Sequence, residues 1–192
     1  MILLLASKNK NKKKEMQLIL PPSIEIMDLN DLEFEEDIEE TGKTLKENAI
    51  LKAQFLYQKL KVNCIAEDSG LEVEFLEGNP GVYSARYAGP QKNDLENIKL
   101  LLDHMKTANN RNAQFRTVIA GIINNQEFTF EGIIKGKIAN ISAGNSGFGY
   151  DPIFIPEFFD QTFAELGEEI KSKISHRSRA VQKLLHFLQS YQ

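Results

Sequence analysis

The opening stretch of the chain, MILLLASKNKNKKKEMQLILPP, decides the fold class. It begins with an uninterrupted apolar run over residues 2–5, which is typical of a strand buried on both faces. Apolar residues then recur with helical spacing as far as Pro21, where the pattern must end. A buried strand that runs directly into a helix predicts an α/β protein.

The rest of the chain continues this mixture. Thr44 and Glu47 have the spacing of a capping box, which predicts a helix that an apolar stripe extends to near Val62. Asn124-Asn125 predicts a hairpin turn between two strands. The other expected elements are strands over residues 23–27, 63–67, 71–75, 113–123 and 127–134 and helices over residues 94–105 and 176–188. The hairpin makes the predicted sheet partly antiparallel.

Composition excludes several classes of protein. The 192 residues fit one domain or one compact two-lobed unit, and we find no linker within them. Lys and Arg total 23 against 27 for Asp and Glu, so a formal charge of −4 disfavours a general nucleic-acid binder. A single Cys64 excludes an internal disulfide, and the three histidines lack zinc-ligand spacing.

The apolar runs of the sequence are short. The N-terminal run is shorter than the core of a signal peptide, and no span approaches the roughly 20 apolar residues of a transmembrane helix. We therefore expect a cytoplasmic protein that does not act at a membrane.

The segment SKNKNKKK, residues 7–14, places five lysines where a strand gives way to a helix. The start of a helix carries partial positive charge, so lysines there lose stability unless an anion offsets them. A phosphate group would do so, held by backbone N–H groups and lysine together. For Lys12, with Ser7 and Asn9 beside it, we favour phosphate contact, whereas Lys10, Lys13 and Lys14 also fit a solvated basic face.

The segment Ser175-His176-Arg177 repeats this arrangement, because a serine suited to capping precedes two potential cations. Two helix starts could then face one anion. His176 taken alone is also compatible with an ordinary packed histidine.

Carboxylates are the second group of candidate functional residues, after the cations suited to an anion. Glu39-Glu40 precedes a helix and Glu67-Asp68 ends a strand, so two distant parts of the chain could converge on Mg²⁺. Glu39-Glu40 could equally interact with the following helix dipole alone. The ring of Phe148, between two glycines, suits stacking on a base, or packing in a tight turn.

Six ordered motifs together resemble the inosine triphosphate pyrophosphatase family, also called the Ham1 type, over nearly the whole chain. These are SKNKNK at 7–12, EETG at 39–42 with ENA at 47–49, EDSGL at 67–71, PGVYSARY at 80–87, GFGYDP at 147–152, and Lys171 with SHR at 175–177.

This resemblance implies a fold, an activity and partners. The fold would be an α/β, two-lobed single domain over residues 1–192, with a long twisted mixed sheet flanked by helices and the active site in the cleft between the lobes. The activity would be Mg²⁺-dependent hydrolysis of ITP, dITP and XTP to the monophosphate and pyrophosphate, with Mn²⁺ as a possible substitute. The protein would be a homodimer whose partner is a small purine nucleotide, not a nucleic acid.

The resemblance also assigns roles to individual residues. Glu40 and Asp68 would hold metal, and Asp68 would be the general base. Lys52 and Ser69 would assist near the phosphates. The triphosphate would be bound by the segment Ser7, Lys8, Asn9, Lys10, Asn11 and Lys12. The base and the sugar-phosphate would be framed by Phe148, Gly149, Tyr150, Asp151, Lys171, His176 and Arg177.

The sequence departs from the family pattern at two positions. Lys8 stands where glycine is frequent, and Glu67 stands where a second aspartate is common. Two alternatives stay open, namely a related nucleotide pyrophosphatase with another base preference and a nucleotide-binding module without turnover.

Overall fold

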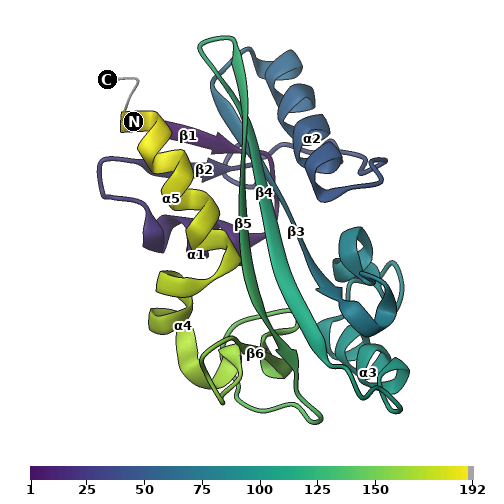
Figure 1. Ribbon diagram of the computed structural model, residues 1–192. Coiled ribbons are helices and arrows are strands. Elements are labelled where there is room, and N and C mark those ends of the chain that lie inside the picture. Colours follow the sequence, from purple (N-terminus) through teal and green to yellow (C-terminus); the bar gives the residue numbers. More distant parts are fainter. Residues whose placement is uncertain (190–192) are drawn as a thin grey trace. The chain divides into compact units, whose positions relative to one another are not determined.

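The computed structural model describes residues 1–189, which form one mixed sheet and several helices (Figure 1). The strands are β1 (Ile2–Leu5), β2 (Glu25–Asp28), β3 (Cys64–Val73), β4 (Asn112–Ile123), β5 (Gln126–Ile138) and β6 (Phe154–Pro156). The α-helices are α1 (Lys10–Ile19), α2 (Leu45–Leu60), α3 (Asp94–His104), α4 (Phe163–Ile174) and α5 (His176–Gln189). Short 3-10 turns span Glu74–Leu76, Gly81–Arg86 and Asp151–Ile153.

The sheet has six strands in the order β2-β1-β3-β4-β5-β6. Strand β1 is parallel to both β2 and β3, whereas β6 is antiparallel to β5. Asn124 and Asn125 link β4 to β5 with φ angles of 49° and 64°, the left-handed conformation that a tight two-residue hairpin turn needs. The predicted α/β class with a partly antiparallel sheet is therefore confirmed.

The chain divides into two compact units, each with its own core. The first unit comprises residues 1–68, 117–132 and the described chain from His176 onward, and the second comprises residues 69–116 and 133–175. In the first unit, α1 and α5 pack on strand residues such as Leu3, Leu5 and Ile65. In the second, Phe115, Phe154 and Phe163 form the centre of the core.

The structure differs from the predicted elements in the middle of β3. We expected two short strands around Asp68-Ser69-Gly70, but a single strand runs through them. Gly70 permits this, because a Cβ there would lie 2.3 Å from the carbonyl oxygen of Gly81. The absence of a side chain lets the neighbouring chain approach without breaking the strand.

Two further elements were not predicted. Strand β6 has only three residues. Helix α4 begins with a capping box between Thr162 and Glu165, but Gly167 interrupts it with a φ of 78°. Among residues 1–189, no helix combines the length and the apolar character needed to cross a membrane.

Candidate active site

The loop between β1 and α1 is built around its own capping bonds. The Asn9 side chain accepts hydrogen bonds from the backbone N–H groups of Asn11 and Lys12, at 3.0 and 3.2 Å. The Ser7 hydroxyl in turn accepts from the N–H of Asn9 at 3.1 Å. Two of the N–H groups that we expected to bind phosphate therefore already have a protein partner.

The lysines of this segment separate into two groups. Lys10 and Lys14 are exposed, and Lys13 pairs with Asp31 at the surface. Lys8 contacts Asp37, whose side chain is almost fully exposed. These lysines fit the solvated basic face.

Lys12 is different, because it turns inward. Its Nζ lies 3.4 Å from the carbonyl oxygen of Glu67 and 3.6 Å from Oε1 of the same residue. Burial lowers the pKa of Lys12, although the Glu67 carboxylate opposes that shift. Lys12 therefore lies among the buried charged residues of the first unit.

Lys52 brings the two expected metal ligands together. Its Nζ donates to Glu40 Oε1 at 2.8 Å and to Asp68 Oδ1 at 2.9 Å. Burial disfavours the Lys52 charge, but the attraction of Asp68 and Glu40 outweighs it and raises the pKa of Lys52. The chain thus gathers around one buried lysine two carboxylates that we expected from the sequence to converge on Mg²⁺, and their role as metal ligands stays a prediction.

Helix α2 sets this geometry. Its capping box at Thr44 fixes the helix start, and Asn48 and Lys52 lie on one face because they are four residues apart. The Asn48 amide donates to Asp68 Oδ2 at 3.3 Å and accepts from the N–H of Gly42 at 2.8 Å. From the sequence, Asn48 was placed only within the ENA motif at 47–49 and was given no role.

A second buried network joins α1, β3 and α5. Arg177 is 1% exposed and donates to Glu67 through Nε and Nη2, at 2.8 and 2.7 Å. Its Nη1 donates to Glu15. Burial opposes the Arg177 charge, but Glu67 and Glu15 more than compensate and raise its pKa. His176, directly before Arg177, is also buried.

The second unit holds the remaining predicted residues. Lys171 pairs with Asp151, and both side chains are buried. The Lys171 Nζ also lies 4.7 Å from the centre of the Phe148 ring, a cation–π distance. The Asp151 carboxylate accepts from the N–H of Phe148 at 2.9 Å, and Asp94 accepts from the N–H of Gly149 at 2.7 Å. The turn that carries the aromatic ring is therefore fixed from both sides.

Tyr150 and Ser69 complete the predicted set. Tyr150 is buried, donates to the carbonyl oxygen of Ser84 at 2.9 Å, and has a pKa raised by that burial. These contacts give Tyr150 a packing role in the second unit. Ser69 directly follows Asp68 on β3 and is half-buried.

The donor set fits Mg²⁺ better than a softer metal. Mg²⁺ is commonly bound through one or two carboxylates, with water and substrate phosphates completing its coordination. Glu40 and Asp68 offer such a pair, and Lys52 already holds an oxygen of each near a positive charge. Residues 1–189 contain no group of three or more His, Cys, Asp and Glu side chains arranged for a metal.

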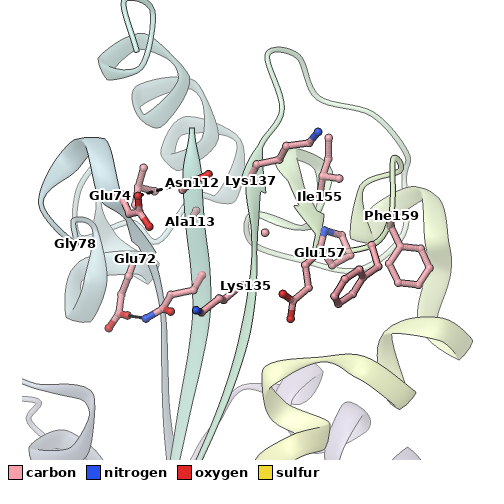
Figure 2. A pocket seen from close by; sticks show the side chains of 15 residues that line it. Glu72, Glu74, Gly78, Asn112, Ala113, Lys135, Lys137, Ile155, Glu157 and Phe159 are labelled. Carbon is pink, nitrogen blue, oxygen red and sulfur yellow. Dashed lines mark hydrogen bonds between the residues drawn. The ribbon is translucent and has the colours of Figure 1, made fainter. Parts of the chain in front are cut away.

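A pocket of about 650 Å³ lies elsewhere in the second unit, and residues of β3, β4, β5, β6 and the chain after β6 are among those that line it (Figure 2). Gln114 donates to Glu72 at 2.6 Å, and Asn112 donates to Glu74 at 3.1 Å, along one wall. None of the predicted site residues lines this pocket.

Comparisons with known proteins agree with these motifs. A family model described as the Ham1 family matches residues 3–187. A protein named dITP/XTP pyrophosphatase from Flavobacterium psychrophilum is 52% identical over 190 residues, which are 99% of this chain and 100% of that protein. A protein of the same name from Bacillus subtilis is 45% identical over 191 residues, with 97% and 96% coverage.

Solved structures give the same result for the fold. The Ham1 protein of Staphylococcus aureus superposes with a TM-score of 0.90 at 41% identity, with full coverage of both chains. A HAM1 protein from Coxiella burnetii has a TM-score of 0.89 at 38% identity, with 99% of each chain covered.

Proposed function

The chain belongs to the Ham1 family, and from this premise we propose that it hydrolyses ITP, dITP and XTP to the nucleoside monophosphate and pyrophosphate, which removes them from the nucleotide pool. The observation that carries the proposal is the meeting of Glu40 and Asp68 at the buried Lys52 ammonium. Relatives that are 43–52% identical carry the name dITP/XTP pyrophosphatase.

The first unit supplies the groups for the phosphates. Lys12 and Lys52 place positive charge beside Glu67, Glu40 and Asp68, and we assign triphosphate binding to the segment from Ser7 to Lys12. Glu40 and Asp68 are the proposed ligands of Mg²⁺, with Mn²⁺ as a substitute. The metal, when bound, supplies charge that neutralises the phosphate oxygens as the bridge between the α and β phosphates breaks.

Asp68 is the proposed general base. Its carboxylate accepts a proton from the water whose oxygen bonds to the α phosphorus, while the α–β bridge breaks and pyrophosphate leaves. Lys52 and Asn48 each donate to a different oxygen of Asp68, so the carboxylate is fixed in orientation before the substrate arrives. Ser69, the next residue on β3, assists near the phosphates.

The second unit supplies the groups for the base. The Phe148 ring offers a stacking surface, and Lys171 beside it offers a donor toward the 6-oxo group that hypoxanthine and xanthine carry in place of the adenine amine. Asp151 fixes Lys171, while Gly149 and Tyr150 shape the turn. We assign His176 and Arg177, from α5, to the same recognition step.

The proposal extends to the assembly and the location of the protein. We propose a homodimer in the cytoplasm that acts on a free nucleotide, on the strength of the resemblance of the six motifs. Light scattering of the purified chain measures its mass in solution and checks the dimer.

A nucleotide panel tests the activity. Pyrophosphate release is measured from ITP, dITP, XTP, ATP and GTP, with Mg²⁺ and again with excess EDTA. We expect rapid release from the first three only, and only with the metal. Equal rates on ATP and ITP would instead indicate another base preference, and binding without release would indicate a nucleotide-binding module.

A further inference from the structure

Glu67 lies at the centre of a set of charges contributed by three elements of the first unit. Its two carboxylate oxygens accept from Arg177 at 2.7 and 2.8 Å, and the Nζ of Lys12 lies 3.6 Å from the oxygen at the shorter distance. The Glu67 side chain is 0% exposed. One carboxylate on β3 therefore forms ion pairs with a cation from α1 and a cation from α5.

Glu15 completes this arrangement from the other side of Arg177. It accepts from Nη1, so every nitrogen of the guanidinium donates to a carboxylate. Glu15 also lies three residues after Lys12, on neighbouring turns of α1. Helix α1 thus presents a cation to Glu67 and an anion to the guanidinium that Glu67 binds.

Glu67 and Asp68 are neighbours in one strand, and their side chains point to opposite faces of the sheet. Asp68 contacts Lys52 and Asn48 of α2. Glu67 contacts Lys12 and Arg177 of α1 and α5, and both of its oxygens are engaged there. The two adjacent carboxylates therefore have separate environments and separate partners.

We infer that Glu67 is a positioning residue that acts through Lys12, and that Glu15 supports it by holding Arg177. The inference rests on the proposed function, because it gives Lys12 the triphosphate as its ligand. Metal binding belongs to Glu40 and Asp68, on the other face of the strand.

The physical reason is preorganisation. Lys12 and Arg177 repel each other, and the shared oxygen of Glu67 cancels that repulsion where the two cations meet. A lysine that is already held in place loses less side-chain freedom when it binds an anion than a lysine that moves freely in water. Glu15 still pairs with Arg177 when the Glu67 charge is removed, so the loss of that charge should weaken nucleotide binding mainly through Lys12.

A double-mutant cycle tests this coupling. The variants are Lys12→Ala, Glu67→Gln, the two combined, and Glu67→Asp, which keeps the charge. Glu72→Gln is the matched control, because Glu72 lies on the same strand and also binds an arginine, with Arg116 Nε at 3.0 Å, but in the second unit. For each variant, KM and kcat for dITP, the Mg²⁺ concentration for half-maximal rate, and the melting temperature are measured.

The expected results distinguish positioning from metal binding. Glu67→Gln should raise KM about fivefold or more in the wild-type background, but by no more than about twofold when Lys12 is already alanine. Glu67→Asp should recover most of the loss, and Glu72→Gln should leave KM unchanged. The Mg²⁺ requirement should be the same in wild type and in Glu67→Gln at saturating dITP.

Two results would overturn the inference. Equal effects of Glu67→Gln in both backgrounds would show that Glu67 does not act through Lys12. A Mg²⁺ requirement raised about tenfold or more would make Glu67 a metal ligand. If melting shows that Glu67→Gln does not fold, the cycle is run with Glu67→Asp, whose shorter side chain draws the carboxylate back from Lys12. The smaller rise in KM that remains should then appear only in the background that retains Lys12, and an equal rise in both backgrounds would overturn the inference.

Binding measurements separate this inference from the proposed activity. The cycle is repeated with the dissociation constant of dITP, measured by calorimetry in EDTA. A wild-type chain that binds dITP but releases no pyrophosphate contradicts the proposed function while the cycle still tests Glu67. A wild-type chain that shows no dITP binding by calorimetry and no dITP turnover in the kinetic assay contradicts both the proposed function and the inference about Glu67.

Discussion

Buried charged side chains make up much of the candidate site in this chain. Each ion pair that a buried cation forms also affects the stability of the fold. Lys52 is held by two carboxylates, whereas Lys171 has its ion pair with Asp151. Removal of one partner from a buried pair leaves an uncompensated charge, which is far more costly than loss of a surface pair. A substitution at one of these residues can therefore reduce activity, stability or both, so each variant is assayed for both.

Asp68→Asn should abolish most turnover while the protein stays folded. Asparagine is nearly isosteric with aspartate but cannot accept the proton, and Lys52 keeps Glu40 as an anionic partner. Loss of a general base alone costs about 10²–10⁴-fold in rate. The test measures kcat and the melting temperature on one sample. Near-normal kcat at saturating Mg²⁺ would remove Asp68 from the mechanism.

Lys171→Met should be strongly destabilising, and Lys173→Met on the same helix is its control. Lys171 is buried against Asp151, whereas Lys173 pairs with Glu169 at an exposed position four residues away. Urea unfolding should show a loss of about 3–5 kcal/mol for Lys171→Met and of less than about 1 kcal/mol for Lys173→Met. Similar losses for both would show that Lys171 has no special structural role.

At the scale of elements, the most reliable predictions came from local patterns. The capping box at Thr44, the Asn124-Asn125 turn and the apolar run of β1 each act over a few residues, and the structure confirms all three. Helix α4 was missed because Gly167 interrupts its periodicity, although its capping box was visible in the sequence. Strand β6 is too short to give a pattern.

In the candidate site, too, residues within local motifs could be predicted, whereas contacts between distant parts of the chain could not. The motifs predicted Glu40, Lys52 and Asp68, and the structure brings them together. The bond between Glu67 and Arg177 joins residues 110 positions apart, so no local pattern could reveal it. Glu15 was missed for this reason, since its role depends on a helix at the other end of the chain.

Close approach between β5 and the start of α5 gives a prediction about an element. A Cβ at Gly132 would lie 2.0 Å from the carbonyl oxygen of His176 and 2.5 Å from the N–H of Ala180. Gly132→Ala should therefore displace the start of α5, which carries Arg177. We expect a loss of stability of about 1–3 kcal/mol and a raised KM for dITP.

Thr129→Ala, at an exposed position on the same strand, is the control for the Gly132 variant. Both variants are compared by urea unfolding and by steady-state kinetics. Unchanged stability and KM in Gly132→Ala would mean that α5 tolerates displacement and that its position does not matter for the site.

At the scale of the molecule, neither compact unit is a continuous stretch of chain. Strands β3, β4 and β5 each contribute residues to both units, which divide at residues 68/69, 116/117 and 132/133. A strand cannot lose its pairing in one half without affecting the ladder in the other half. Shared strands therefore favour cooperative unfolding of the whole chain.

We expect one unfolding transition for the entire protein. Calorimetry should give a van't Hoff enthalpy equal to the calorimetric enthalpy, and circular dichroism should give the same midpoint as tyrosine fluorescence. Of the four tyrosines within residues 1–189, Tyr83, Tyr87 and Tyr150 lie in the second unit and Tyr57 lies in the first, so tyrosine fluorescence reports mainly on the second unit. Two separated transitions would show that the units unfold independently.

The interleaved order of the units also determines when each can fold during synthesis. The second unit ends at Ser175, so all of its residues have been translated before α5 begins. The first unit starts with β1 but lacks Ala180, Val181, Leu184 and Leu188 of its core until α5 is made. Lys12, Glu15 and Glu67 likewise precede Arg177 on the ribosome. A chain that ends at residue 175 because of a premature stop codon would therefore contain every residue of the second unit. It would lack α5, the helix that completes the core of the first unit.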